Sequence, residues 1–359
     1  MKFTSILKSP LWGNILALLL GCVFVVALLL TVEGLLHFKV WMNTKPGEGA
    51  IHSNLNEIIV PYPRLGYRAK PSAVLKETLT RGGAEIYSCT YHIDQNSNRI
   101  TPFADSDERT CTALFLGCSF TFGTGVNNDE TLPAQFAANA PTYHPVNAGL
   151  NGYGLQQVWL QLTDIGFLDK LPFDKGIAVY TFIDHHVDRL VGTPAVLNAW
   201  EYPLPWLIEK NGRVEYNGTF AARDPFQFFI NRYCRRSHLF RFVENRLRTP
   251  VITEKISSEM LDFTAFVLMD AARKLHELRP GIQLYMLFFP DCIRADEIKK
   301  RLDENLVKSL DYSDLFDAAA LPKDRLWYKD SGAAEFGHPK AEAYTIVANQ
   351  LAKDIPACQ

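Results

Sequence analysis

The chain opens with one continuous apolar run, after which short and long apolar patterns alternate. Residues 11–32 carry no charged side chain, and from Ile15 onward they are almost purely aliphatic. A helix rises about 1.5 Å per residue, so this run reaches about 30 Å, the thickness of a bilayer's hydrocarbon core. The run is long for a signal peptide, and 31–34 lack a small-x-small cleavage pattern. We predict an uncleaved transmembrane anchor over 11–32, with a cleavable signal peptide as the alternative.

The charges that flank this run indicate its orientation. Two lysines and the amino terminus precede it without any acid, whereas Glu33 accompanies Lys39 and Lys45 beyond it. Loops rich in Lys and Arg stay on the cytoplasmic side of a membrane. The bias therefore predicts a cytoplasmic tail over 1–10 and a single pass through the cytoplasmic (inner) membrane. The bulk of the chain is then extracytoplasmic, in the periplasm where there is one.

Beyond the anchor the pattern changes twice before it becomes regular. Prolines and glycines predict a stalk or linker, which we place at 33–83. From Ala84 to Ile100 the residues alternate toward a polar turn, as in a hairpin. A later segment, about 192–253, contains an Asn211-Gly212 turn between two alternating runs and predicts an insertion with a hairpin. This aromatic-rich insertion is either a lid or wall over a site or a purely structural elaboration.

The remaining chain alternates short apolar runs with longer helical patterns. The predicted strands cover 113–116, 144–147, 177–182 and 282–289, with a weaker one at 325–328. The predicted helices lie near 131–138, 155–166, 257–278, 293–309 and 339–353. Short buried strands joined by crossover helices predict a parallel sheet covered on both faces. We therefore predict an α/β fold, a three-layer α/β/α sandwich with a parallel, flavodoxin-like sheet over 84–359. Its ligands belong at the carboxyl ends of the strands.

The composition narrows the class of function. With 47% hydrophobic and 21% charged residues in 359, the chain can bury a core of ordinary size. The formal net charge is -2 and no basic, aromatic-rich stretch occurs, so nucleic acid is not an expected partner. The seven cysteines include no C-x-x-C pair and no zinc-type Cys/His spacing. Cys89 and Cys111 flank a turn-rich segment and are either bridged or free buried thiols.

The strongest chemical signal follows the first strand of the predicted sheet. There Leu114-Phe115-Leu116 runs into Gly117-Cys118-Ser119-Phe120 and on to Gly123. A serine at a tight turn from strand to helix exposes its hydroxyl at the carboxyl end of the sheet, with its own N–H near an incoming carbonyl oxygen. Ser119 is therefore the candidate nucleophile, and a plain Gly/Ser turn without chemistry is the alternative.

A second motif near the C-terminus supplies the groups that a serine nucleophile needs. Glu335-Phe336-Gly337-His338-Pro339 places an acid three residues before a histidine at the start of the last predicted helix. A serine hydroxyl needs a base to take its proton, and that base needs an acid to fix its tautomer. We predict a triad of Ser119, His338 and Glu335. Asp330 is the rival acid, eight residues before the histidine, and a helix-capping role is the alternative for His338.

These motifs resemble the blocks of the SGNH/GDSL hydrolases, a family of serine esterases. Gly117-Cys118-Ser119-Phe120 is similar to that family's Gly-Asp-Ser-Leu block, and Glu335 to His338 is similar to its Asp-x-x-His block. Asn147 to Gly152 is similar to the block whose final glycine gives an N–H to the oxyanion. The resemblance covers about 111–354 and implies the SGNH fold, Ser119 as nucleophile and His338 as base. It also implies Ser119 and Gly152 as oxyanion donors, with Gly149 second to Gly152.

The chain departs from that pattern where the family's Gly-x-Asn-Asp block should follow the strand at 177–182. Here the sequence continues Asp184-His185-His186-Val187-Asp188, without the asparagine whose amide donates to the oxyanion. An imidazole N–H is able to donate, whereas an ionised carboxylate accepts. We therefore predict His185 as the third donor, with His186 or a protonated Asp184 as alternatives, or a site with two backbone donors only. A metal held by this segment is a weaker interpretation, because adjacent histidines point in different directions.

Together these features predict a membrane-anchored serine esterase that cleaves an acyl or acetyl ester of an envelope glycan or lipid. No metal and no cofactor is expected, because hydroxyl, imidazole, carboxylate and backbone dipoles suffice. The alternatives are an O-acyltransferase with the same residues, acting on an extracytoplasmic polysaccharide, and a catalytically silent binding or assembly module. Arginines at 232, 235, 236, 241, 246 and 248 form a basic cluster. That cluster is either a solvated helix face or a surface for anionic glycans or lipid head groups.

Overall fold

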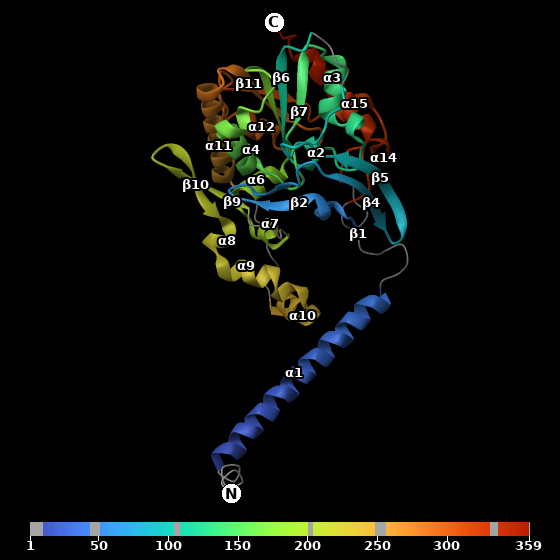
Figure 1. Cartoon of the computed structure of the whole chain (residues 1–359), viewed down its shortest axis with the longest axis vertical. Helices are drawn as coiled ribbons and strands as arrows, with labels where there is room; N and C mark the ends of the chain where they lie inside the picture. The colour runs from blue at the N-terminus through green and yellow to red at the C-terminus, as the bar shows by residue number, and fades with distance from the viewer. Residues whose placement is uncertain are drawn as a thin grey trace.

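A five-stranded parallel sheet with strand order β12-β11-β8-β6-β7 forms the centre of the protein (Figure 1). The structure is a computed structural model that describes residues 10–43, 51–103, 108–199, 204–247, 256–330 and 337–358. The strands are β6 (Cys111–Gly117), β7 (Tyr143–Asn147), β8 (Lys175–Phe182), β11 (Gly281–Phe288) and β12 (Val307–Asp311). All seven residues of β6 are buried, as expected for a strand covered on both faces.

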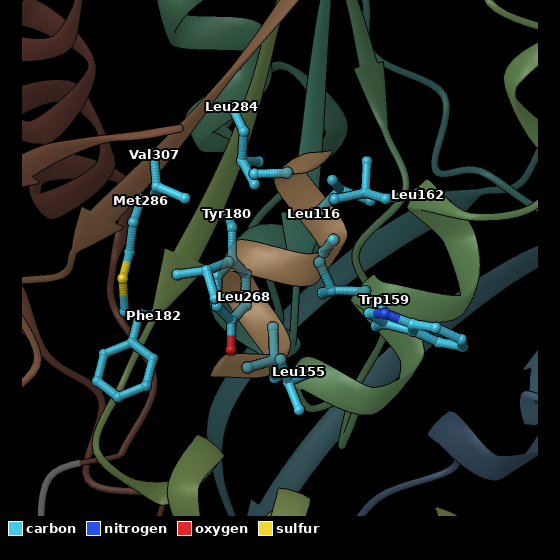
Figure 2. Close-up of a cluster of buried hydrophobic side chains, with 14 of the residues drawn as sticks. Leu116, Leu155, Trp159, Leu162, Tyr180, Phe182, Leu268, Leu284, Met286 and Val307 are labelled. Carbon is cyan, nitrogen blue, oxygen red and sulfur yellow. The ribbon is translucent and has the colours of Figure 1, made fainter. Parts of the chain in front are cut away.

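Helices cover both faces of this sheet. On one face α4 (Leu155–Leu162) and α11 (Ser258–Leu278) pack against side chains of β6, β8 and β11. Figure 2 shows this cluster, to which Leu116, Tyr180 and Phe182 of the sheet, Leu155 of α4 and Leu268 of α11 belong. The other face is covered by α3 (Leu132–Asn139) and α15 (Ala341–Asp354). The predicted three-layer α/β/α sandwich is thus confirmed.

Short helices connect these layers. They are α2 (Ser119–Phe122), η3 (Asn128–Glu130), α5 (Ile165–Leu168), α6 (His185–Val191), α12 (Ala295–Lys299), α13 (Leu315–Ala319) and α14 (Lys323–Leu326). Two sequence predictions fail among them. The helix expected over 293–309 ends at Lys299, and the edge strand β12 follows; its two apolar residues, Val307 and Leu310, are three positions apart, which is a helical spacing. The weak strand expected at 325–328 is instead α14, followed by an extended Trp327 that bridges Pro339.

Residues 51–81 form strands where the sequence suggested a linker, and 84–92 add the first strand of the predicted hairpin. They make β1 (Ile51–His52), η2 (Leu55–Ile58), β2 (Ile59–Tyr62), β3 (Gly66–Ala69), β4 (Val74–Arg81) and β5 (Ala84–His92). β5 pairs with β4, which precedes it, whereas its expected partner beyond residue 93 contributes only an Ile93–Arg99 bridge. The apolar side chains of these strands pack against Phe122 and Tyr153, next to the predicted site. The prolines and glycines at 61–66 therefore mark a turn between paired strands.

The predicted insertion is a hairpin followed by a helical arm. After α7 (Pro194–Ala199), β9 (Pro205–Lys210) and β10 (Arg213–Thr219) pair around Asn211 and Gly212. Both turn residues have positive φ, as the predicted type of turn requires. The arm comprises α8 (Phe220–Arg223), α9 (Pro225–Arg232), η4 (Cys234–Arg236) and α10 (His238–Leu247).

The N-terminal apolar run lies in a single helix, α1 (Pro10–Asn43), that extends away from the sheet (Figure 1). Its segment Gly13–Met42 is long and apolar enough to cross a membrane, and none of its most apolar window is buried within the protein. An exposed apolar helix of this length suits a membrane span or a signal sequence equally well by composition. Near its C-terminal end α1 contacts α10, and Glu33 accepts a hydrogen bond from Ser237, the residue before α10.

The cysteines pair differently from the sequence interpretation. Cys111, at the start of β6, forms a disulfide with Cys358, near the C-terminus. Of the two alternatives for Cys89 and Cys111, the bridge between them is wrong, and Cys89 is the free, buried thiol of the other alternative. The reason lies in the topology, because the chain beyond α15 returns to the edge where β6 begins, whereas Cys89 lies in a different sheet.

Candidate active site

Ser119 lies at a sharp turn between β6 and α2. Gly117, the last residue of β6, has φ +142, and a Cβ there would lie 2.5 Å from Thr121 Oγ1 and 2.9 Å from Thr181 O. Only glycine fits this close approach of backbone and side chains. Cys118 turns inward and is fully buried, whereas Ser119 begins α2 and keeps 6% of its surface exposed. The turn thus presents the Ser119 side chain, and not that of Cys118, at the carboxyl end of β6.

A buried arginine that the sequence interpretation missed holds the loop after Ser119. The Arg99 guanidinium donates to the carbonyls of Phe122 at 2.7 Å, Gly123 at 2.5 Å and Val126 at 2.6 Å. Its Nε donates to Asn128 at 3.1 Å, and desolvation lowers the pKa of Arg99 to about 10. One planar side chain therefore fixes four acceptors in the turn that follows the nucleophile. No spacing in the sequence signals this role, because Arg99 and its acceptors are 23 to 29 residues apart along the chain.

His338 lies on the loop before α15, and an aspartate fixes its ring. Asp330 Oδ2 accepts from Nδ1 of His338 at 2.6 Å, and Oδ1 accepts from the backbone N–H of the same residue at 2.9 Å. The Asp330 side chain is only 2% exposed, whereas that of His338 is 27% exposed. Two bonds from one buried carboxylate hold the imidazole in the tautomer whose Nε2 accepts a proton.

The acid beside His338 is therefore Asp330, the rival of Glu335 in the sequence interpretation. Glu335 belongs to residues 331–336, which lie outside the described part of the chain. Around that segment the backbone of Gly337 donates to Tyr328 O, and that of Tyr328 donates to His338 O. These bonds bring 328–330 back alongside the histidine. A separation of eight residues is thus no obstacle, because these backbone bonds hold Tyr328 beside Gly337 and His338.

Ser119 and His338 line the same cavity, which has a volume of about 450 Å³. The Phe120 ring lies 5.9 Å from the His338 ring, centroid to centroid. The cavity is lined by Ser119, Phe120, Ile183, Asp184, His185, Arg189, Phe289, Pro290, Asp291, Cys292, Lys323, Trp327, Gly337 and His338. The carboxyl ends of β6, β8 and β11 all contribute to it, as expected for a parallel sheet. The structure thus brings the predicted nucleophile and base to one site.

The two glycines that the family resemblance singles out differ in their hydrogen bonding. Gly149 donates its backbone N–H to Asn147 Oδ1 at 3.2 Å, so that donor is engaged. Gly152 has φ +79, and we find no acceptor for its N–H among the described residues. The Asn151 amide bonds Thr124 Oγ1 at 2.7 Å, which ties this loop to the turn after Ser119. Gly152 itself is not among the residues that line the cavity.

The three side chains considered as the third oxyanion donor have different environments. Asp184 accepts from the backbone N–H groups of Ile293 at 3.0 Å and Arg294 at 3.1 Å, so its oxygens act as acceptors. The Cys292 thiol is 3.4 Å from the same carboxylate, and burial with this neighbouring charge raises the pKa of Cys292. This corrects the alternative that a protonated Asp184 donates to the oxyanion. Asp184 instead ties the β11–α12 loop to the end of β8.

The two histidines of the same segment point in opposite directions. His186 is fully buried and stacks on Tyr180, whose hydroxyl lies 2.7 Å from Nδ1. Burial lowers the pKa of His186 well below 6.5, so this ring is a neutral part of the core and not the donor that the alternative required. His185 lines the cavity with a side chain that is 78% exposed. Among the described residues no group of three or more His, Cys, Asp or Glu side chains is placed to hold a metal ion.

The fold and this site define an α/β protein with a serine and a histidine at the carboxyl edge of a parallel sheet. A scan against protein-family models finds no match, and neither does a search of curated proteins. Solved structures do match. A lipolytic protein of the G-D-S-L family from Desulfitobacterium hafniense is 14% identical, with a TM-score of 0.38, over 68% of this chain and 99% of that one.

Two further solved structures give similar values. A member of the lipolytic G-D-S-L family from Veillonella parvula is 11% identical, with a TM-score of 0.36, over 68% of this chain and 98% of that one. An acetyl xylan esterase from the rumen bacterium Butyrivibrio proteoclasticus is 12% identical, with a TM-score of 0.35. That match covers 71% of this chain and 64% of the esterase.

Proposed function

We propose that the protein is a membrane-anchored serine esterase of the SGNH type, with Ser119 as nucleophile and His338 as base. The observation that carries this proposal is the shared cavity of Ser119 and His338, with the His338 ring held by Asp330. We assign Asp330 the orienting role that the sequence motif gave to Glu335. The order of the motifs along the chain supports the same reaction class.

The reaction follows from these positions. His338 Nε2 takes the proton of the Ser119 hydroxyl as Oγ bonds to the acyl carbon, and the carbonyl oxygen becomes an oxyanion. The N–H groups of Ser119 and Gly152 are the proposed backbone donors, and His185 is the proposed third donor. The C–O bond of the ester then breaks, and the leaving alcohol takes the proton from His338. Water, activated by the same imidazole, releases the acid and restores Ser119.

The walls of the cavity support an ester with an apolar acyl part and a polar alcohol part. Phe120 lies 5.1 Å from Phe289 and 5.9 Å from Trp327, ring centroid to centroid, and forms an aromatic wall next to Ser119. Arg189 and Lys323 bring cations to the same cavity. We propose an acyl or acetyl ester of an envelope glycan or lipid, presented outside the cytoplasmic membrane. Transfer of the acyl group to a sugar hydroxyl uses the same residues and is distinguished by its product.

Hydrolysis of chromogenic acyl esters by the full-length protein in detergent tests this function. We expect turnover of p-nitrophenyl acetate by the parent, and a loss of at least about 10³-fold in kcat for Ser119→Ala, because the nucleophile is gone. Ser88→Ala is the matched control, since Ser88 is exposed on β5 and its hydroxyl lies 3.1 Å from that of Thr78. The turnover of p-nitrophenyl esters with longer acyl chains shows which acyl length the cavity beside the aromatic wall accepts. Equal activity of the parent and Ser119→Ala would overturn the proposal.

A further inference from the structure

The arm formed by α8 to α10 is rich in arginine and contributes little to the core. Residues 220–247 contain six arginines and two acids. No residue of 225–236, which comprise α9, Tyr233 and η4, is buried, although this stretch contains four aromatic side chains. A segment of this kind does not derive its stability from burial within its own domain. Its exposed apolar side chains therefore indicate that the arm binds another surface.

The large apolar side chains of this arm are unusually exposed. Phe226 is 73% exposed, Phe229 52% and Tyr233 55%, and on α10 Phe242 and Val243 are 46% and 42% exposed. Single exposed apolar residues are ordinary on protein surfaces, but consecutive helices that each present aromatic rings are not. Helices that lie in a membrane interface combine such aromatic faces with arginine or lysine on the polar face.

The arm is attached to α1 where the apolar run ends. The Glu33 carboxylate accepts from Ser237 Oγ and from the backbone N–H groups of His238 and Leu239, each at 2.7 Å. One turn further along α1, His37 Nδ1 lies 3.0 Å from His238 Nε2. Glu33 is the first charged residue after the run 11–32. If that run fills the hydrocarbon core, this contact holds the N-terminus of α10 at the boundary between acyl chains and head groups.

The charge of the arm suits an anionic surface. Arg235 is paired with Glu244, and both side chains are 14% exposed, so this ion pair fixes η4 against α10. On the outside of α10, Arg246 stacks over Phe242 at 5.0 Å, and Arg241 lies 3.1 Å from His238 Nδ1. Guanidinium groups beside exposed rings bind phosphate while the rings enter the apolar layer. The segment 225–247 has one acid, Glu244, and that acid is already paired.

We propose that the arm of α9, η4 and α10 lies on the membrane that α1 spans, with its arginines on anionic phospholipid head groups. The proposal rests on α1 as an uncleaved anchor, which is part of the proposed function. Two attachments to one membrane, a helix through it and an arm along it, fix how the catalytic domain is held. The cavity with Ser119 is then held at a fixed distance from the lipid and in a fixed orientation. This favours substrates anchored in or close to that membrane.

Hydrogen–deuterium exchange of the full chain in lipid nanodiscs tests this proposal. One set of discs contains phosphatidylcholine alone, and the other contains phosphatidylcholine with phosphatidylglycerol. We expect amides of 226–243 to exchange more slowly in the anionic discs, while those of the hairpin 205–219 exchange equally in both. The triple variant Arg232→Gln, Arg236→Gln, Arg241→Gln should lose that protection, by about fivefold for each arginine removed from the lipid surface. Arg213→Gln, on the hairpin, is the matched control.

The outcomes separate this proposal from its competitors and from the esterase. Equal exchange of 226–243 in both kinds of disc, unchanged by the triple variant, would overturn the lipid contact. Protection that depends on protein concentration in detergent would instead assign the arm to a second copy of the chain. Intact mass shows whether α1 is retained. Hydrolysis of a soluble ester by the triple variant should equal that of the parent, so loss of catalysis and loss of lipid binding are read independently.

Discussion

At the scale of single residues, the site depends on how the side chain of Asp330 is placed. Its carboxylate is buried and binds both the ring and the backbone of His338. The sequence motif correctly pointed to a carboxylate for this histidine, but spacing favoured Glu335. Spacing is a poor guide on loops, because the path of the chain between two residues is free to close on itself. On a helix or strand the same spacing would have fixed the relative direction of the acid and histidine side chains.

Substitution of Asp330 and of Glu335, one at a time, should therefore show which of the two carboxylates orients His338. We expect Asp330→Asn to lower kcat by about 10³- to 10⁴-fold with little change in KM, because the amide no longer stabilises the charged imidazole or its correct tautomer. Glu335→Gln should stay within about threefold of the parent. Steady-state kinetics on a chromogenic ester measure both. The reverse ranking of the two variants would return the role to Glu335.

Arg99 is expected to position the nucleophile without touching the substrate. Arg99→Met leaves four acceptors of the turn without their donor, which should lower the free energy of unfolding by roughly 3 kcal/mol. It should also lower kcat, because the turn that carries Ser119 loses its fixed geometry. Arg99→Lys should recover part of the stability but less of the activity, since an ammonium lacks the planar fork. Urea unfolding and kinetics, measured on the same samples, distinguish this from a purely structural role, for which activity per folded molecule would not change.

His186 predicts how stability depends on pH. Burial lowers the pKa of His186 well below 6.5, so the unfolded chain binds this proton more readily than the folded protein. Above pH 6.5 both states hold His186 neutral, and the free energy of unfolding is unaffected by it. As the pH falls below 6.5, the unfolded chain takes up the proton and the free energy of unfolding decreases. His186→Gln keeps a polar partner for Tyr180 and does not titrate. We expect it to reduce the slope of unfolding free energy against pH between about 5 and 6.5, as followed by urea unfolding; an unchanged slope would contradict this.

At the scale of elements, the sequence predicts the central strands better than the edge. The strands β6, β8 and β11 combine short length with a largely apolar sequence, which is typical of buried parallel strands. The edge strand β12 has the sequence Val-Lys-Ser-Leu-Asp and resembles a helical surface. The strands at 51–81 are interrupted by prolines and glycines, and their pairing partners are decided by tertiary contacts. Patterns along the chain do not record such partners.

The disulfide that joins β6 to the C-terminus belongs to this scale as well. Cys358→Ser releases the segment beyond α15 from the start of β6, across a separation of 247 residues. We expect the free energy of unfolding to fall by about 2–5 kcal/mol, because the unfolded chain is no longer cross-linked. Urea unfolding measures this, with Cys234→Ser, in the arm, as the control. Non-reducing peptide mapping should recover Cys111 linked to Cys358, and a free thiol at both positions would contradict the extracytoplasmic location.

At the scale of the whole molecule, the sequence predicts that Ser119 and His338 meet, although they belong to opposite ends of the domain. Ser119 follows β6 at the carboxyl edge of the sheet, where a parallel sheet places its ligand sites, and His338, on the loop before α15, lines the same cavity. The same reasoning cannot predict which side chains turn inward there. His185 and His186 are neighbours, yet one lines the cavity and the other is buried beside Tyr180. That choice depends on the packing of α6, which only the folded chain defines.

The central claim is that Ser119 is a nucleophile activated by His338, and covalent labelling tests it most directly. The full-length protein is treated with a fluorophosphonate, and the modified residue is located by peptide mass spectrometry. We predict a single adduct on Ser119, absent in Ser119→Ala and strongly slowed in His338→Ala. A folded parent, with Cys111 and Cys358 still joined, that gains no adduct or carries it on another residue would contradict the account.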